Sequence, residues 1–406
     1  MAVHLEGVEL FDPDAYADGV PHETFARLRR EAPVYRHEQP GAAPFWAVTR
    51  YRDIVAVSRD WATYSSERRG ALLGEPPEEV LATQRLMMLN MDPPRHSKLR
   101  ALVNKGFTPR MIAQLTGPVR RVCDELVDGV AERGRCDFVT EVAAELPLQV
   151  IAELLGIPQS DRHQVFEWSN TMVGSDDPEW RGSPEDAQNA AMSMYAYANE
   201  LAVQRKDSPR EDLVSVLMQA EVDGEQLTEM EFDLFFLLLA VAGNETTRNL
   251  ISGGMLALIQ HPEERRRLLD DRSLLDTAVE ELLRWVTPVM QFQRTAQRDT
   301  EIAGVPIAEG ERVALYYVSA NRDEAVFDEP MRFDVGRSPN EHITFGAGGP
   351  HFCLGNSLAR LEIRTMFDVL LDRLPDIELD GPPRKLRSNF LNGLKSMPVR
   401  FSAAAS

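Results

Sequence analysis

Segments in which apolar residues recur at helical spacing make up most of this chain, and they limit the folds that it can adopt. This spacing predicts helices at residues 21–30, 109–132, 185–205, 212–221, 228–260, 262–269, 276–286 and 356–374. Short strand-like runs occur at Val34 and at residues 45–49, 300–307 and 313–317, and residues 390–401 add the hairpin signal Asn392-Gly393. Many helices with a few short strands favour a mainly α fold with small β-sheets over alternating βαβ units.

The chain shows no internal repeat and no low-complexity linker, so we expect one domain spanning residues 1–406. Its 44 basic and 64 acidic residues give a net charge of -20. A chain this acidic is repelled by nucleic-acid phosphates and anionic bilayers unless its basic residues gather on one face. We therefore expect neither a nucleic acid nor a membrane surface as a partner.

The cysteines and the apolar segments indicate the compartment. Cys123, Cys136 and Cys353 form no CxxC pair, which favours neither a disulfide framework nor a zinc site. Residues 1–14 lack the basic and apolar regions of a secretory signal. The most apolar stretch, residues 234–244, has 11 uncharged residues, well short of the roughly 20 that span a bilayer. The sequence thus predicts a soluble cytoplasmic protein without a membrane anchor.

The segment from Phe345 to Gly355 is the densest unusual stretch, with glycines at 346, 348, 349 and 355 and with Cys353 just before a predicted helix. Unpaired N–H groups and the positive end of the helix dipole stabilise a thiolate at such a position. Glycines allow a large flat ligand to approach the backbone. These features suit a thiolate metal ligand, although an isolated cysteine more often has a buried structural role.

The long predicted helix at 228–260 contains Ala242, Gly243, Glu245, Thr246 and Thr247 in its interior. A glycine there costs roughly 1 kcal/mol relative to alanine. The Thr246 hydroxyl can bond to the carbonyl of Ala242 and loosen the helix locally. Small residues beside an acid and an alcohol suit a groove in which a diatomic ligand receives protons. The alternative is close helix packing through Ala242 and Gly243, with Glu245 solvated.

Two charged features are uninformative when taken alone. Glu281 and Arg284 form an i, i+3 pair, ordinarily worth a few tenths of a kcal/mol. A charge run is by default a solvated helical face, but within an acidic chain it also suits a docking surface or a cradle for bound carboxylates. This run, between residues 95 and 121, has no acidic residue and contains Arg95, Lys98, Arg100, Lys105, Arg110, Arg120 and Arg121.

In combination, these features resemble the bacterial cytochrome P-450 family of haem-thiolate monooxygenases, over essentially the whole chain. The resemblance implies a triangular-prism fold that holds haem between the long helix and the cysteine loop with its following helix. It implies Cys353 as the metal ligand, Thr246 and Glu245 as catalytic residues, and ion pairs among Glu281, Arg284 and Arg337. The cofactor-binding residues that it implies are His96, Arg100, Ala242, Gly243, Arg294, Phe345, Gly346, His351, Cys353 and Gly355.

The resemblance also implies the chemistry. The cofactor would be haem b, with O2 as co-substrate, and the Cys353 thiolate would favour O–O cleavage. Thr246 would hold bound dioxygen and order a water, while Glu245 would relay protons. One oxygen atom would enter an aliphatic C–H bond. Electrons would come from a small acidic ferredoxin and its reductase, which uses NAD(P)H, and the basic residues near 95–121 are the candidate dock.

Branch-level likenesses point to a substrate class. Phe345 lies eight residues before Cys353, one more than is usual in the family. This departure, and residues 90–94, 106–110 and 388–398, are similar to the branch that hydroxylates sterols and branched lipids. A steroid, terpenoid or branched lipid is therefore expected, and an aromatic acid or a secondary metabolite is the alternative. The expected pocket lining is Leu72, Leu73, Val241, Ala242, Val289 and Leu391.

Two other classes of protein remain possible from the residues. A non-catalytic haem-thiolate carrier would keep Cys353 but has no need of Glu245 and Thr246. A cysteine hydrolase could use Cys353 as its nucleophile, but His351, two residues away, is poorly placed as a general base.

Overall fold

The computed structural model describes residues 5–39, 42–173, 179, 183–221 and 224–403. The helices are α1 (His22–Glu31), α2 (Tyr51–Arg59), α3 (Glu78–Gln84), α4 (Arg95–Val103), α5 (Pro109–Gln114), α6 (Thr116–Ala131), α7 (Glu145–Leu155), α8 (Arg162–Val173), α9 (Pro184–Asp207), α10 (Leu213–Gln219), α11 (Glu229–Gln260), α12 (Pro262–Asp270), α13 (Leu275–Val286), α14 (Tyr317–Ala320) and α15 (Asn356–Arg373). The strands are β1 (Val34–His37), β2 (Phe45–Val48), β3 (Tyr64–Ser65), β4 (Arg135–Asp137), β5 (Gln291–Ala296), β6 (Thr300–Ile302), β7 (Val305–Ile307), β8 (Arg312–Tyr316), β9 (Glu378–Leu379), β10 (Arg384–Lys385), β11 (Leu394–Ser396) and β12 (Pro398–Arg400). The expected mainly α fold with small sheets is confirmed.

Two local predictions are wrong. The predicted helix at 109–132 is broken at Leu115, because Pro118 in the first turn of α6 has no N–H and its ring clashes with the carbonyl four residues earlier. Asn392-Gly393 forms no tight hairpin turn, since neither residue has a positive φ. Gly393 instead allows close approach, because a Cβ there would lie 2.3 Å from Oδ1 of Asn249 on α11. Strands β10 and β11 pair across the longer connection 386–393.

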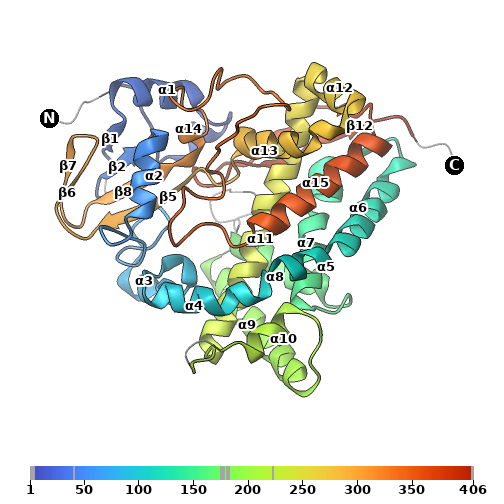
Figure 1. The fold of residues 1–406 in the computed structure, drawn as a ribbon, viewed down its shortest axis with the longest axis horizontal. Coiled ribbons are helices and arrows are strands. Elements are labelled where there is room, and N and C mark those ends of the chain that lie inside the picture. The colour runs from blue at the N-terminus through green and yellow to red at the C-terminus, as the bar shows by residue number, and fades with distance from the viewer. Residues whose placement is uncertain (1–4, 40–41, 174–178, 180–182, 222–223, 404–406) are drawn as a thin grey trace.

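Helix α11 runs through the centre of the molecule, behind α15 in Figure 1. It begins with a capping box in which Thr228 and Glu231 each bond the other's backbone N–H. It packs against α7, α8, α9, α13 and α15, and most of its side chains are buried. A helix buried on nearly every side carries apolar residues all round, which explains its weak amphipathic pattern.

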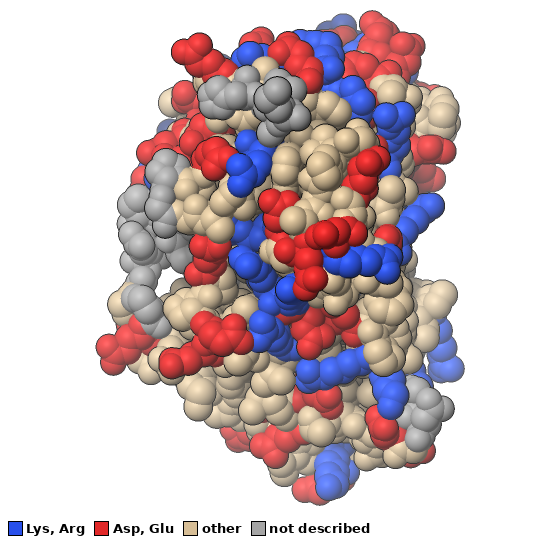
Figure 2. All heavy atoms as spheres, turned by 90° about the vertical axis from the view of Figure 1, so that its left-hand side faces the viewer, with Lys and Arg blue, Asp and Glu red and all other residues tan. Residues whose placement is uncertain are grey.

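The largest sheet joins the N-terminal part of the chain to residues 291–316. Its strand order is β1-β2-β8-β5-β3, and all neighbours are antiparallel except β2 and β8. The ribbon is broad at the end that carries this sheet and α12 and narrows toward α9 and α10 (Figure 1). Acidic and basic side chains are intermixed on the face that Figure 2 shows. No helix in the described part of the chain has the length and apolar character needed to cross a bilayer.

Candidate active site

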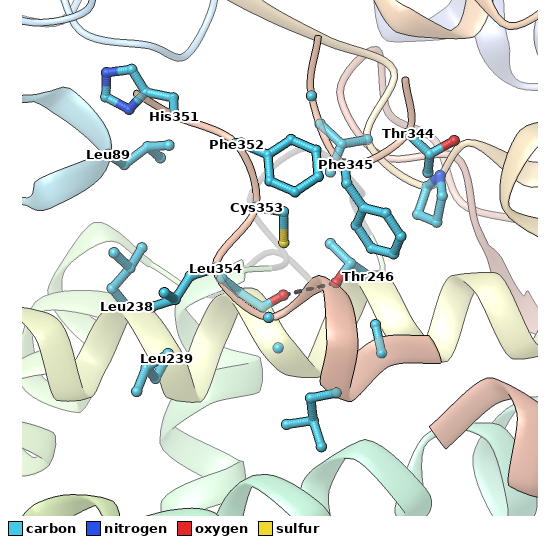
Figure 3. Close-up of a pocket in the computed structure, with 18 of the residues that line it drawn as sticks. Leu89, Leu238, Leu239, Thr246, Thr344, Phe345, His351, Phe352, Cys353 and Leu354 are labelled. Carbon is cyan, nitrogen blue, oxygen red and sulfur yellow. Dashed lines mark hydrogen bonds between the residues drawn. The ribbon is translucent and has the colours of Figure 1, made fainter. Parts of the chain in front are cut away.

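Cys353 lies at the end of a loop that packs against α2. Its backbone N–H donates to the carbonyl oxygen of Phe345 at 2.8 Å, and its sulfur points toward α11 (Figure 3). Gly349 has a φ of 79°, and a Cβ there would lie 2.3 Å from the Ser58 carbonyl oxygen, so this position requires glycine. Burial raises the pKa of the Cys353 thiol, and the backbone N–H of Gly355 opposes this shift. A metal ion at the sulfur would displace the thiol proton.

The middle of α11 packs closely on one side and borders a cavity on the other. The Thr246 hydroxyl donates to the carbonyl oxygen of Ala242 at 2.8 Å (dashed line in Figure 3). A Cβ on Gly243 would lie 2.7 Å from Cδ1 of Ile151, so the glycine lets α7 approach. Ala242, Gly243 and Thr246 line the same cavity as Cys353. The geometry therefore combines the groove and the close packing that were considered as alternatives.

Glu245 is not solvated. It is 4% exposed, and its Oε2 accepts a hydrogen bond from Nη2 of Arg248. Burial raises the pKa of Glu245, while the Arg248 guanidinium opposes this shift. Glu245 is not among the residues that line the cavity.

Four nitrogen-bearing side chains from three separate segments border the cavity. His96 and Arg100 come from α4, Arg294 from β5 and His351 from the cysteine loop. The ring centroids of His96 and His351 are 4.4 Å apart, and Arg100 Nη2 donates to the carbonyl oxygen of Phe352 at 2.5 Å. Burial and the neighbouring guanidinium groups lower the pKa of His96 to about 4 and hold the pKa of His351 well below its ordinary value.

This cationic cluster has the chemistry of a site for a dianionic ligand. Nδ1 of His96 and Nε2 of His351 are buried and have no hydrogen-bond partner in the described part of the chain. Carboxylates placed here would accept from these donors and from the two arginines, at charge-assisted strength. The two propionates of a haem would provide such carboxylates, and Cys353 would bind its iron. The residues present therefore fit a thiolate-ligated haem.

The rest of the cavity wall is apolar. The cavity has about 1480 Å³ of atom-free space, counting the part that is open to solvent. Leu238 and Leu239 face it from α11 and Leu89 from the segment before α4 (Figure 3). The apolar lining side chains away from the cysteine loop and the helices behind it include Met88, Leu89, Phe235, Leu238, Leu239, Pro288, Val289 and Phe292.

Ala242 and Val289 line the cavity as expected, but four other predicted pocket residues do not. Leu72 is 44% exposed, and Leu73 packs against a cluster of N-terminal side chains. Val241 packs into the main core, because it lies on a different side of α11 from Ala242. Leu391 pairs with Val289 through an isolated β-bridge and is set back from the cavity.

The predicted ion pairs form a buried network away from the cavity. Arg284 and Glu281 are both 0% exposed, with Nε and Oε2 2.7 Å apart, and Nε of Arg337 lies 3.2 Å from the same oxygen. Arg284 also donates to the carbonyl oxygens of Asn321, Pro330 and Arg332. The network fixes α13 to the segment that leads into the cysteine loop.

Several basic residues of the run at 95–121 have acidic neighbours in the fold, although the run itself contains no acidic residue. Lys98 lies 3.1 Å from Glu225, and Lys105 donates to the carbonyl oxygen of Glu221. Arg120 pairs with Asp124 and Asp368, and Arg121 with Glu125. Arg95 and Arg110 are exposed and form no ion pair with a described residue. The surface available for an acidic partner is therefore smaller than the sequence indicated.

Sequence reasoning missed several functional candidates. Arg248 lies one helical turn after Glu245 and could have been found by that spacing. Leu89, Leu238 and Phe292 reach the cavity, but apolar residues at helix or strand spacing give no signal that separates a pocket from a core. Glu362, on α15, is a buried acid that lines the cavity, and only its apolar neighbours in the predicted helix hinted at its burial.

For the hydrolase alternative, the structure does not place His351 as the general base of Cys353. His351 points toward α4 and away from the side of the loop that carries the Cys353 sulfur (Figure 3). Its ring packs against His96 instead.

Known proteins resemble this chain along nearly its whole length. A steroid C26-monooxygenase of Rhodococcus jostii is 45% identical, and the match covers 98% of this chain and 86% of that protein. A methyl-branched lipid omega-hydroxylase of Mycobacterium tuberculosis is 41% identical, and the match covers 98% of this chain and 96% of that protein.

Solved structures agree with the sequence relatives. A cytochrome P450 of Mycobacterium marinum in complex with pseudoionone has 40% identity and a TM-score of 0.90, covering 98% of this chain and all of that one (100%). One from Bacillus megaterium in complex with testosterone has 32% identity and a TM-score of 0.84. The match covers 94% of this chain and 99% of that one. The family profile described as cytochrome P450 matches residues 135–397. Because the family profile and relatives matched over nearly the whole chain agree, the chain belongs to the cytochrome P450 family.

Proposed function

We propose that this cytochrome P450 hydroxylates an aliphatic C–H bond of a steroid, a terpenoid or a methyl-branched lipid. The observation that carries the proposal is the apolar wall around the groove at Thr246, formed by Leu89, Leu238, Leu239 and Val289. A hydrocarbon gains roughly 25 cal/mol per Å² on burial against such a wall. The names of the relatives, which act on steroid and methyl-branched lipid substrates, support the same class.

Different residues of the site would bind the haem iron, the haem propionates and the substrate. Haem with a cysteine thiolate is the family's cofactor, and when bound it supplies the activation of O2; we propose haem b. Cys353 would bind the iron, with the N–H of Gly355 bonded to its sulfur. His96, Arg100, Arg294 and His351 would hold the two propionates. Apolar side chains orient the substrate and exclude bulk water.

Thr246 has a specific task. Because its hydroxyl donates to the carbonyl of Ala242, its oxygen lone pairs remain available on the side of the cavity. The hydroxyl would accept a hydrogen bond from a protonated group or a water in the groove and so hold a proton there. Glu245, whose carboxyl group is held by a hydrogen bond from Arg248, would feed protons toward this point.

We propose that electrons reach the site from another protein, a small acidic ferredoxin supplied by a reductase that uses NAD(P)H. The candidate dock is the surface of α4 and α5, where Arg95 and Arg110 are exposed. Phe352, 37% exposed beside Cys353, lies near the same surface, because Arg100 of α4 bonds its carbonyl. Attraction between opposite charges would speed the encounter.

The docking proposal predicts a salt-dependent reduction rate. Reduction of the haem by ferredoxin should slow as salt rises, because screening weakens long-range attraction. Arg95→Glu and Arg110→Glu should each lower the rate at low salt, whereas Arg36→Glu, on β1, should not. Stopped-flow reduction measures this. A rate that is independent of salt and of Arg95 and Arg110 would place the dock elsewhere.

We also propose that residues 1–406 form one catalytic domain in the cytoplasm. The full-length match to the Mycobacterium marinum enzyme supports the first point. The cysteines Cys123, Cys136 and Cys353 are all free thiols, which is usual in a reducing compartment.

Turnover tests the function directly. The holoenzyme, reconstituted with a ferredoxin, its reductase and NAD(P)H, should convert a steroid, terpenoid or branched lipid to a product with one added hydroxyl on an aliphatic carbon. With ¹⁸O2 the hydroxyl should carry the label. Product formation from aromatic acids alone would overturn the proposed substrate class.

A further inference from the structure

Residues 67–89 carry part of the cavity wall but have little hydrophobic core of their own. Met88 and Leu89 line the cavity, and Figure 3 shows Leu89 facing it. The structure describes all of residues 67–89, and their only buried apolar side chains are Ala71, Leu81 and Met88. A segment with so few buried apolar contacts opens easily unless hydrogen bonds hold it. The position of this wall therefore depends on the polar groups that bind it.

The side-chain amide of Asn90 joins two parts of this segment. Asn90 is 4% exposed. Its Oδ1 accepts a hydrogen bond from the backbone N–H of Ala71 at 2.8 Å, and its Nδ2 donates to the carbonyl oxygen of Gln84, the last residue of α3, at 3.0 Å. A side-chain amide offers an acceptor and a donor at once, which neither a carboxylate nor an aliphatic side chain does. Asn90 thus ties the start of the segment to the end of α3.

The turn at 69–71 extends this connection to β5. The carbonyl oxygen of Ala71 accepts from the backbone N–H of Gln293 at 2.8 Å, and the side-chain amide of Gln293 donates to the carbonyl oxygens of the two residues before Ala71. Gln293 is 0% exposed, and its neighbours on β5, Phe292 and Arg294, line the cavity. Ala71 therefore bonds Asn90 through its N–H and β5 through its carbonyl oxygen, which fixes the two parts of the cavity lining relative to each other.

We infer that Asn90 is a specificity-determining residue, whose amide holds Met88 and Leu89 in place relative to β5 and so sets which carbon of the substrate reaches the groove at Thr246. The inference rests on the proposed hydroxylation of a lipophilic substrate. Asn90 ends a short 3-10 turn that contains both Met88 and Leu89, but it does not line the cavity itself. It is therefore a positioning residue. Because a wall that is already ordered costs less entropy on binding, a ligand that touches it binds more tightly and in fewer orientations.

Iron-binding probes of two sizes test this inference on the haem-loaded protein without a substrate. Imidazole occupies only the space next to the iron, whereas 4-phenylimidazole adds a ring that extends along the cavity wall. Asn90→Leu keeps the approximate size of the side chain and removes both amide bonds. We expect it to weaken 4-phenylimidazole binding about tenfold and imidazole binding less than about twofold, as measured by the Soret shift. If the ratio of the two dissociation constants is unchanged, the inference is wrong.

Asn199→Leu is the matched control. The amide of Asn199 also joins two elements, because it donates to Asp233 and so links α9 to α11. Neither Asn199 nor Asp233 lines the cavity. This variant also loses an amide bond between elements, but it should bind both probes as the unaltered holoprotein does. Equal weakening of 4-phenylimidazole in the two variants would indicate a general loss of stability and would overturn the inference.

Hydrogen exchange and product analysis separate specificity from a purely structural role. In Asn90→Leu the backbone amides of residues 69–71 and 88–91 should exchange faster, while the carbon monoxide complex keeps its Soret band. With a substrate that the enzyme hydroxylates, KM should rise and the hydroxyl should be spread over more carbons. Faster exchange with unchanged probe binding would assign Asn90 to stability alone and contradict the inference. The probe and exchange results need no turnover, so they remain decisive even if no steroid, terpenoid or lipid is oxidised.

Discussion

At the scale of single residues, the site follows from positions where ordinary preferences are broken. Cys353 ends a glycine-rich loop just before a helix, and Gly243 and Thr246 lie in the interior of a continuous buried helix. These departures were readable in sequence because each is costly unless a ligand or a close neighbour requires it. The neighbours that pack against the two glycine positions were not, since Ile151 and Ser58 come from distant segments. Most of the apolar pocket residues, such as Leu89, Leu238 and Phe292, left no sequence signal that separates a pocket from a core.

Cys353→His tests the proximal ligand. Imidazole can still bind iron, so haem should be retained, but the electron donation of the thiolate is lost. We expect the carbon monoxide complex of the reduced protein to lose its red-shifted Soret band and turnover to fall below detection. Cys136→Ala, at a buried cysteine in β4, should keep both. A variant at Cys353 that retains the band and full turnover would refute the assignment.

Glu245→Gln separates a proton relay from an ion pair. The substitution removes the carboxylate charge that pairs with the buried Arg248 guanidinium, so the free energy of unfolding should fall by about 3–5 kcal/mol. Turnover should also slow, because the relay loses its ionisable group. In the double variant with Arg248→Met, stability should recover while turnover stays slow. Recovery of both, measured by urea unfolding and product assays, would show that Glu245 acts only through stability.

At the scale of elements, the long helices were predicted well, and the short ones only in part: α1, α10, α12 and α13 were predicted and others were not. The sequence pattern located α11 and α15 within a few residues, because an apolar pattern that repeats over many turns is clear even where single residues depart from it. It missed α2, α3, α4, α7 and α8. Short helices are marginal in isolation and depend on tertiary packing, as when Ile54 and Val57 of α2 are buried under the sheet. Strand β5 was missed because its residues Gln291–Ala296 do not alternate.

Glu280 links α13 to α15 and should make that contact sensitive to acid. Burial opposes ionisation, but hydrogen bonds from Arg360 and His342 outweigh it and lower the pKa of Glu280 to about 2. A lowered pKa means that the carboxylate stabilises the fold above its ordinary pKa of 4.5 and that this contribution is lost as the pH falls toward 2.

Glu280→Gln should therefore lower the free energy of unfolding by roughly 2 kcal/mol at neutral pH, and the gap to wild type should close as the pH falls from 4.5 toward 2. Asp276→Asn is the matched control, because the ion pair of Asp276 on α13 with Arg364 on α15 joins the same two helices but is exposed. Such an exposed pair is worth at most about 1 kcal/mol. Urea unfolding across pH measures both. A gap at Glu280 that is independent of pH would contradict the linkage.

At the scale of the whole molecule, composition excluded partners better than it identified a substrate. The net charge of -20 argues against nucleic acid as a partner. The substrate depends instead on the pocket, whose lining comes mainly from residues 88–107, 235–250 and 283–294 and from the cysteine loop. Its shape depends on how α4, α11 and β5 meet, which no local pattern records. The family was readable because its motifs bind one cofactor; the substrate was not, because apolar walls of many shapes share one composition.

The spin state of the ferric haem tests the central claim most directly. A lipophilic substrate that enters the apolar cavity displaces water from the iron, so titration of the holoprotein should shift the Soret band toward the high-spin form. We predict saturable shifts with a steroid, a terpenoid or a methyl-branched lipid and none with small polar compounds. If aromatic acids or small polar molecules shift the spectrum while every steroid, terpenoid and lipid leaves it unmoved, the assignment to lipophilic aliphatic substrates is contradicted.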